Sequence, residues 1–374
     1  MATVSIYKNP TYDENEMLSS VKAHFDAFGG IEHFIKPKDK AFIKVNLLMA
    51  RKPEAVTTTH PSLVYAVAKL AADAGGDVVI GDSPGGPYTA ALLERAYRIC
   101  GFADAASRAG VKLNTDTSSK KESYQDGKIC KSFNFITPWH EADCYISLCK
   151  CKTHAMTGFT GAVKNNFGLI PGLEKPEFHM RYQKVNEFVT MLVDLCGCAK
   201  PDFTIMDAVT GMEGDGPSGG TPRHIGLTIA SDNAFALDKI AVKAIGLLDT
   251  EAFTLSKSIE MGACPETIEL VGDNVELPFV KDYKRAASHK ITPTTGLPKF
   301  IKKPIDNIFQ PHPVILKEKC AGCGECAMSC PVKTIKIENG KAHIDKTKCI
   351  KCFCCQEMCP PKAIKIKSTQ IFRL

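Results

Sequence analysis

The sequence predicts an α/β fold, in which helices cover both faces of a mostly parallel sheet, with a small separate α+β domain at the C-terminal end. Three observations predict it. Short apolar strands alternate with amphipathic helices through residues 1–280, a pattern typical of crossover units between parallel strands. A stretch rich in Lys and Pro follows. Beyond it, cysteines recur at regular spacing next to prolines.

The helices and strands of the large domain follow from hydrophobic periodicity and from start and stop signals. Residues 14–28 place Met17, Val21 and Phe25 on one face of a helix that ends at two glycines, and Pro61 suits the first position of the next helix. Further helices are expected at 88–100, 185–196 and 234–245. Strands are expected at 4–7, 41–45, 77–80, 144–148, 203–206 and 225–229.

These elements divide the chain into three parts. Residues 1–280 form the α/β domain, in one body or in two lobes. Residues 281–313 lack a clear period and are rich in Lys and Pro, so they are expected to be an extended connector. Residues 314–374 form the small domain.

Composition indicates a globular protein with a substantial core. The chain has 374 residues, of which 44% are hydrophobic and 24% charged. The first twelve residues do not resemble a signal peptide, and no uncharged apolar run could span a bilayer. We therefore expect a cytoplasmic protein with no membrane association, whose 17 cysteines are thiols or metal ligands rather than disulfides.

The C-terminal quarter is strongly basic. Residues 281–374 hold 17 Lys and 2 Arg against 7 acidic residues. No basic stripe interleaved with aromatic residues and no nucleic-acid motif accompanies this charge, so no nucleic-acid partner is expected. The lysines instead offset the negative charge of metal-bound thiolates, and a remaining basic face could steer an acidic redox partner or an anionic substrate.

The cysteine spacing in the small domain is that of bacterial two-cluster ferredoxins. A Cys-x2-Cys-x2-Cys-x3-Cys-Pro motif occurs twice, and its second copy begins 29 residues after the first. In such motifs the fourth cysteine binds the other cluster. The sequence therefore predicts two 4Fe-4S clusters, one held by Cys320, Cys323, Cys326 and Cys359, the other by Cys349, Cys352, Cys355 and Cys330.

Two details of this domain complete the prediction. Zinc is the alternative reading of Cys-x2-Cys pairs, but two tandem motifs that each end in Cys-Pro favour clusters. Cys354 belongs to neither set and is expected to be a plain thiol near a cluster. Residues 334–344 read as a hairpin with Asn339-Gly340 at its turn.

Polar residues gather at several places in the large domain where strands are expected to end. The run 150–172 combines Lys, Thr and Asn with glycines, which suits an anion cradle, although it is no Walker A loop. The run 207–222 follows a strand and contains Glu213, which could bind a cation or act as a general base. The alternatives are a glycine-rich turn with solvated lysines and an ordinary surface loop.

If the sheet is parallel, these loops meet at one edge and form one cleft. The expected residues fall into two groups. The catalytic candidates are His154, Lys164 and Glu213, with His60 also nearby. The candidates for holding a cofactor or substrate are Lys44, Asn46, Lys152, Thr153 and Asn165.

Other cysteines of the large domain lie close together in the sequence. Cys149 and Cys151 are two residues apart, as are Cys196 and Cys198. These spacings fit no cluster motif, so the four are expected to be buried structural thiols.

Several short segments resemble the family known as domain of unknown function 362. They are Lys44-Val45-Asn46, Thr59-His60-Pro61, Gly81–Gly85, Lys152-Thr153-His154, Thr160–Gly168, Pro171-Gly172, Asp207-Ala208 and Gly211–Pro217. Members of that family come mostly from anaerobic bacteria and archaea, often end in a two-cluster ferredoxin module, and have no agreed activity. The resemblance implies the architecture and leaves the reaction open.

The leading functional expectation is an anaerobic oxidoreductase, in which the two clusters pass electrons between a soluble partner of the ferredoxin or flavodoxin type and the cleft of the large domain. A flavin, another phosphate-bearing cofactor or an anionic small molecule would bind there. The first alternative is a non-catalytic electron carrier or adaptor that docks a redox partner. The second is non-redox chemistry, such as a metal-assisted isomerisation, with clusters that serve as structure or sensor.

Overall fold

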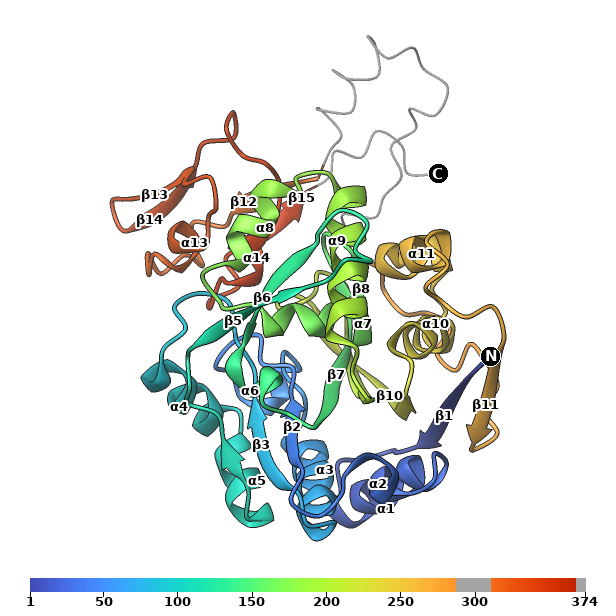
Figure 1. The fold of residues 1–374 in the computed structure, drawn as a ribbon. Helices are drawn as coiled ribbons and strands as arrows, with labels where there is room; N and C mark the ends of the chain where they lie inside the picture. The colour runs from blue at the N-terminus through green and yellow to red at the C-terminus, as the bar shows by residue number, and fades with distance from the viewer. Residues whose placement is uncertain (287–310, 368–374) are drawn as a thin grey trace.

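A mixed, mostly parallel sheet forms the centre of the computed structural model, which describes residues 1–286 and 311–367 (Figure 1). Most of the predicted connector, 287–310, lies outside the described residues. Nine strands of the described chain join this sheet, in the order β11-β1-β10-β9-β7-β2-β3-β4, with β8 paired to β7. The strands are β1 (Ala2–Lys8), β2 (Lys40–Lys44), β3 (Asp77–Gly81), β4 (Lys112–Leu113), β7 (Cys144–His154), β8 (Gly158–Thr160), β9 (Phe203–Glu213), β10 (Thr221–Ser231) and β11 (Ile268–Gly272).

The parallel part of the sheet runs from β9 through β7, β2 and β3 to β4. Only β10 and β8 pair antiparallel with their neighbours in this sheet. The predicted fold class is therefore confirmed. Because the strands from β9 to β4 are parallel, their carboxyl ends meet at one edge, where polar loops gather.

Helices cover both faces of this sheet, because neighbouring residues of each strand point to opposite sides. Ile43 and Ile146 pack in one apolar cluster, whereas Phe42 and Tyr145 pack in another. The first face carries α1 (Glu14–Asp26), α3 (Pro61–Asp73), α4 (Ala90–Ile99) and α5 (Phe102–Ala109). The second carries α7 (Ala162–Asn165), α9 (Val185–Ala199), α10 (Ala234–Ala244) and α11 (Phe253–Glu260).

Shorter elements complete the large domain. They are α2 (Ile31–Phe34), α6 (Thr137–His140), α8 (Lys175–Arg181), the hairpin of β5 (Ser119–Ser123) and β6 (Ser132–Ile136), and three 3-10 turns at Pro53–Ala55, Asn166–Leu169 and Asp249–Glu251. Three strands are clearly longer than predicted. Residues 149–154 extend β7, residues 207–213 extend β9, and β10 spans Thr221–Ser231 instead of 225–229. The added residues continue to pair with neighbouring strands of the sheet.

The C-terminal module, residues 311–367, contains β12 (His312–Ile315), α13 (Glu325–Met328), β13 (Ile335–Glu338), β14 (Lys341–Ile344), α14 (Cys354–Glu357) and β15 (Ile364–Lys367). Strands β13 and β14 form the predicted hairpin. Asn339 and Gly340 both have positive φ at its turn, as a two-residue hairpin loop requires. Strands β12 and β15 pair across the module and bring its two ends together.

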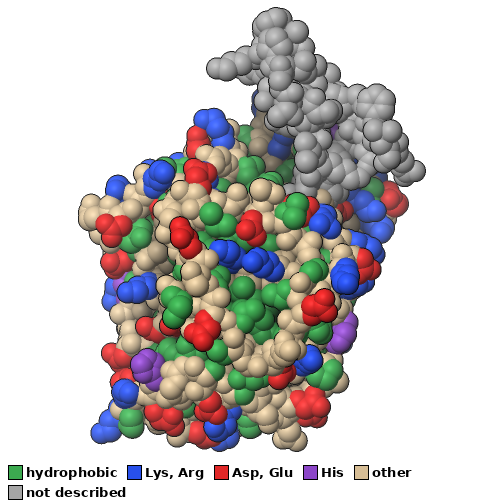
Figure 2. Space-filling view, turned by 90° about the vertical axis from the view of Figure 1, so that its right-hand side faces the viewer, with side chains coloured by type: hydrophobic (Ala, Val, Ile, Leu, Met, Phe, Trp, Pro, Cys, Tyr) green, Lys and Arg blue, Asp and Glu red, His purple; other side chains and the backbone are tan. Residues whose placement is uncertain are grey.

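Figure 2 shows the face that lies on the right in Figure 1, where acidic and basic side chains are interspersed around a central group of hydrophobic ones. Within the described ranges, no helix is both long enough and apolar enough to cross a bilayer.

Three buried histidines, together with the half-buried His60, are expected to make the fold sensitive to acid. Burial lowers the pKa of His24 to about 3 and those of His60, His154 and His179 to about 4. In the unfolded chain these rings bind a proton near pH 6.5, and in the folded protein they stay neutral to lower pH. The free energy of unfolding should therefore fall as the pH drops from about 6.5 toward 4.

Urea unfolding without oxygen at pH 7 and pH 5 measures this effect. His24 bonds Ser5 Oγ (2.6 Å) and Thr228 Oγ1 (3.0 Å) inside the sheet–helix interface. A His24→Gln variant, which keeps polar atoms but cannot titrate, should show a shallower pH dependence. Equal stability of the natural protein at both pH values would contradict the prediction.

Candidate functional site

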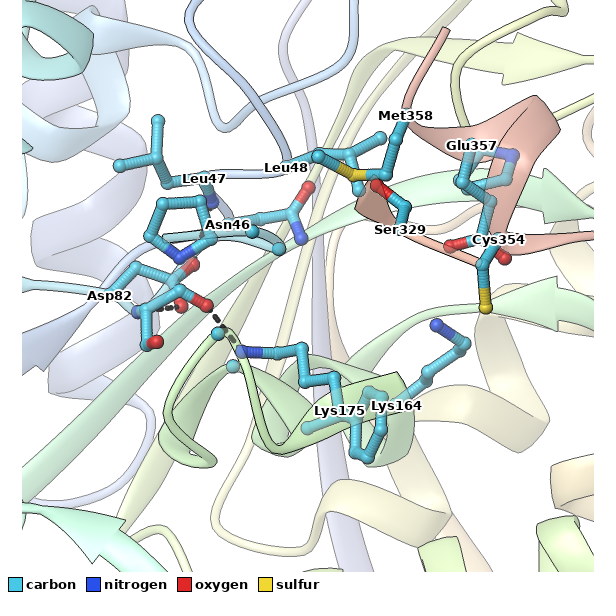
Figure 3. A pocket seen from close by; sticks show the side chains of 18 of the residues that line it. Asn46, Leu47, Leu48, Asp82, Lys164, Lys175, Ser329, Cys354, Glu357 and Met358 are labelled. Carbon is cyan, nitrogen blue, oxygen red and sulfur yellow. Dashed lines mark hydrogen bonds between the residues drawn. The ribbon is translucent and has the colours of Figure 1, made fainter. Parts of the chain in front are cut away.

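A cleft lies where the carboxyl ends of β2, β3 and β7 face the C-terminal module (Figure 3). It encloses about 110 Å³. The large domain contributes Lys44, Asn46, Asp82, Lys152, Lys164 and Lys175, together with glycines and apolar side chains. The module contributes Met328, Ser329, Cys354, Glu357 and Met358. The wall formed by these five module residues is called the module wall below.

A buried ion pair forms the base of the cleft. Lys44 ends β2 and Asp82 follows β3, and their Nζ and Oδ1 atoms are 3.2 Å apart with both side chains almost fully buried. Asp82 also accepts hydrogen bonds from the backbone N–H of Leu47 (2.7 Å). Gly168 packs directly on the pair, and a Cβ there would lie 2.1 Å from Asp82 Oδ1. Only glycine fits at this position.

Hydrogen bonds through two asparagine side chains position Lys152. Lys152 Nζ donates to Asn46 Oδ1 (2.6 Å) and to the carbonyl oxygen of Thr57 (3.0 Å). Asn46 in turn donates to Asn165 Oδ1 (3.2 Å), and Asn165 donates to Ser147 Oγ (2.9 Å). Burial lowers the pKa of Lys152 to about 7.

Two further lysines follow β8 in the chain: Lys164 lies in α7, and Lys175 is the first residue of α8. Lys175 Nζ donates to the carbonyl oxygen of Ser83 (2.6 Å), and burial lowers its pKa to about 7. Burial also lowers the pKa of Lys164. Lys164 Nζ lies 5.6 Å from the ring centre of Phe167 and points toward Cys354 of the module wall in Figure 3.

None of the ion pairs in the described part of the chain includes Lys152, Lys164 or Lys175. Their ammonium groups are bonded to neutral oxygens or lie near an aromatic ring. The cleft is therefore electropositive, which suits an anion.

The module is held against the large domain by polar contacts next to the cleft. Gln356 donates to the carbonyl oxygen of Asp215 (2.9 Å), and Ser218 Oγ donates to the carbonyl oxygen of Gln356 (3.2 Å). Glu357 Oε1 lies 3.1 Å from His154 Nε2. On the other side, Arg51 donates to the carbonyl oxygen of Cys359 (3.3 Å).

The structure brings five of the predicted residues together in the cleft: Lys44, Asn46, Lys152, Lys164 and Asn165. The other predicted residues do not line it. Thr153 alternates with Lys152 along β7, so it faces the opposite side and donates to the carbonyl oxygen of Gly214 (2.8 Å). Glu213 accepts from the backbone N–H of Lys284 (3.1 Å) and pairs with its Nζ (3.2 Å).

The two histidines also have structural contacts. His154 is fully buried, and its Nδ1 accepts from the backbone N–H of Met156 (3.0 Å), so Nε2 carries the proton that faces Glu357. His60 caps α3 and stacks on Tyr12 at 3.5 Å between ring centres. A catalytic role for His154 or Glu213 stays a prediction, and either would act from outside the cleft.

Sequence reasoning did not select several residues of the cleft. Asp82 stands in the Gly81–Gly85 segment, which the sequence singles out through the family resemblance, with no role for its carboxylate. Lys175 begins α8, just beyond the run that suggested an anion cradle. The module wall could not be predicted, because cysteine spacing says nothing about which side of a ferredoxin module faces a neighbour.

The cysteines of the module surround two separate cavities. Cys320, Cys323, Cys326 and Cys359 line one, whereas Cys330, Cys349, Cys352 and Cys355 line the other. Backbone N–H groups point at the sulfurs: Ala363 N is 3.2 Å from Cys359 Sγ, and Ala342 N is 3.4 Å from Cys320 Sγ. Such bonds stabilise cluster thiolates, so the two groups fit the crossed ligation of two cubanes.

A zinc site makes a different demand, since four thiolates must converge on one ion at about 2.3 Å. Among the residues that the structure describes, no group of His, Cys, Asp and Glu side chains is close enough to hold a single ion. Of the four other cysteines that were expected to be buried, Cys149, Cys151 and Cys196 lie in apolar surroundings, where burial raises the pKa of Cys151 to about 12. The prediction was wrong for Cys198, which is only half-buried at the end of α9. The three buried ones are closed off from solvent. They behave as structural thiols.

Comparisons with known proteins give matches to both parts of the chain. The family model for the domain of unknown function DUF362 matches residues 42–243, and that for a 4Fe-4S dicluster domain matches residues 312–360.

Two curated relatives match as well. A thylakoid-associated protein of Synechocystis is 32% identical over 292 residues, which cover 74% of this chain and 88% of the relative. Ferredoxin-2 of Desulfomicrobium norvegicum is 48% identical over 29 residues, or 8% of this chain and 49% of that ferredoxin. Among solved structures, the lactate racemase apoprotein of Thermoanaerobacterium thermosaccharolyticum aligns with 55% of this chain and 50% of its own, at 13% identity and a TM-score of 0.38.

Proposed function

Because the chain belongs to the DUF362 family and carries an iron–sulfur dicluster domain, we propose that it is an oxidoreductase whose two 4Fe-4S clusters exchange electrons with an anionic molecule bound in the cleft. The observation that carries this proposal is the module wall. The domain that holds the clusters also forms one side of a cavity that is lined by four lysines.

The path from the clusters into the cleft is short along the chain. Cys354 in the module wall precedes the cluster ligand Cys355, and Ser329 precedes Cys330. A bound molecule that touches these residues is separated from a cluster ligand by a few covalent bonds. Each cluster transfers one electron at a time, so two clusters suit a two-electron reaction.

The lysines would supply the other half of such a reaction. Electrons added to an organic anion create a basic atom that takes up a proton, and an acid with a pKa near the working pH donates it best. Lys152 and Lys175, whose pKa values burial lowers to about 7, fit that role. Lys164, Lys44 and Asn46 would orient the anion. A flavin or another phosphate-bearing cofactor remains a second occupant that this chemistry allows.

The proposal includes a soluble redox partner and a cytoplasmic, anaerobic setting. Exposed lysines of the module, such as Lys336, Lys348 and Lys367, attract an acidic partner of the ferredoxin or flavodoxin type. The chain has 17 free cysteines and no disulfide in its described part, which fits a reducing compartment.

The test is a reoxidation experiment without oxygen. The clusters are reduced, small organic anions are added one by one, and the electron paramagnetic resonance signal of the reduced clusters is followed. An acceptor that binds in the cleft should remove the signal, and Lys164→Met should slow its removal by about tenfold or more, since a charged hydrogen bond contributes about 1.5–3 kcal/mol.

Lys121→Met is the matched control, because Lys121 is exposed on β5 of the same domain. It should reoxidise at the natural rate. If Lys164→Met also does so with every acceptor that works, the cleft is not where electrons leave. The protein would then act as a non-catalytic electron carrier or adaptor.

A further inference from the structure

The charges that line the cleft do not balance. Four lysines line it against two carboxylates, Asp82 and Glu357. Asp82 pairs with Lys44 (3.2 Å), and Glu357 lies nearest His154 rather than any lysine. A buried ammonium group without an anion is costly, because it has lost its water. When all four lysines are protonated, two positive charges have no matching carboxylate among the residues that line the cleft.

Three buried polar atoms of the cleft have no hydrogen bond among the described residues: Ser83 Oγ, His179 Nδ1 and Glu357 Oε1. Glu357 Oε1 lies 3.1 Å from His154 Nε2, which leaves Ser83 Oγ and His179 Nδ1 for a ligand. Ser83 is 1% exposed and His179 is 4% exposed, and both line the cleft on the side of Lys175. Buried polar atoms are almost always satisfied, so these two indicate that a polar ligand completes the site.

The size of the cleft limits that ligand. It encloses about 110 Å³, whereas pockets for drug-sized molecules span roughly 300–1,000 Å³ and a cavity of about 150 Å³ holds benzene. A molecule with a few non-hydrogen atoms fits inside. The isoalloxazine ring system of a flavin is larger than this space and would have to lie outside it, at the open side of the cleft.

We propose that the cleft binds a small dianion, either a short dicarboxylate or a phosphate group, with Lys152, Lys164 and Lys175 as its cationic ligands and Ser83 as a hydroxyl donor. This inference rests on the proposed function and names its substrate class. The apolar side chains of Leu48 and Met358, which both line the cleft (Figure 3), would contact the uncharged part of a dicarboxylate.

The experiment is anaerobic titration calorimetry on the oxidised full chain with its clusters. The probes are inorganic phosphate, succinate, acetate and flavin mononucleotide. Phosphate or succinate should bind at least about tenfold more tightly than acetate, because the second charge meets a second lysine. Tighter binding of phosphate would indicate a phosphate site, and tighter binding of succinate would indicate a dicarboxylate site.

Variants locate the binding. Lys175→Met should weaken binding of the better dianion by about 10- to 100-fold, and Ser83→Ala should weaken it by a smaller factor. Lys121→Met should leave it unchanged. As a second readout, the better dianion should raise the unfolding temperature of the natural protein and of Lys121→Met but not that of Lys175→Met. This comparison holds even if the variant is less stable.

Three results would overturn the inference: equal affinity for acetate and both dianions, tighter binding of flavin mononucleotide than of phosphate, or natural affinity in Lys175→Met. Failure of the proposed function looks different. A dianion that binds through Lys175 but leaves the reduction and resonance signals of the clusters unchanged would keep the dianion site and remove the redox role. A larger or uncharged acceptor that reoxidises the clusters would keep the redox role and remove the dianion as its substrate.

Discussion

An alanine in place of Cys359 should leave the protein with about half of its iron, that is, about four atoms per chain instead of eight. Cys359 lies in the second motif, yet it lines the cavity of Cys320, Cys323 and Cys326. Its loss should therefore remove the cluster of the first motif and spare the other. Iron and sulfide analysis together with the resonance spectrum of the reduced protein measures the result.

The comparison that decides the pairing uses two further variants. Cys320→Ala should leave the same resonance signal as Cys359→Ala, whereas Cys349→Ala should leave the other one. Cys354→Ala is the control, since Cys354 belongs to neither cavity of ligands, and it should keep both clusters. If Cys359→Ala instead leaves the signal that Cys320→Ala abolishes, each motif would hold its own cluster. About two zinc ions and no iron in the natural protein would exclude clusters altogether.

Asp82→Asn should lower the free energy of unfolding by about 3–5 kcal/mol. The substitution removes the only carboxylate that pairs with Lys44 in the described structure, and Lys44 is fully buried. The ammonium would then remain in the protein interior without a counterion. Urea unfolding at neutral pH, without oxygen, measures the loss.

The matched control is Asp73→Asn. Asp73 pairs with Lys69 one helical turn away, but its side chain is 56% exposed, so the change should stay within about 0.5 kcal/mol. The double variant Lys44→Met/Asp82→Leu should recover much of the stability, because two apolar groups replace the pair. A loss for Asp82→Asn as small as that for Asp73→Asn would show that Lys44 is neutral or reaches water.

The parts of the fold that depend on local sequence were predictable. The Asn339-Gly340 turn fixes its hairpin through two positive φ angles, and Pro61 begins α3 as expected. The lengths of β7 and β9 were not predictable. Residues 150–154 look like a loop because they are polar and lie near glycines, but they pair with β8 and β9. β9 is distant in sequence, and no turn motif in the sequence indicates that the chain folds back to form β8.

The same division holds in the cleft. Lys44 and Asn46 could be placed there because they end a parallel strand, and the carboxyl ends of such strands meet at one edge. Beyond the expected end of a strand, the sequence does not show to which side a side chain points. Thr153 was therefore grouped with Lys152, although it faces the other side of the sheet. Glu357 and Met358 stand between the cluster ligands Cys355 and Cys359 in the sequence. Only the contact between the module and the large domain places them at the cleft.

Because the module wall forms one side of the cleft, the proposed binding of a dianion would depend on intact metal centres. The core of the module is small and consists largely of the cysteines themselves, and such domains depend on their metal to fold. A chain whose clusters have been destroyed by oxygen would lose α14, and with it Glu357 and Met358, from the edge of the cleft. If the cleft binds the proposed dianion, a molecule with damaged clusters would therefore bind it less tightly than an intact one.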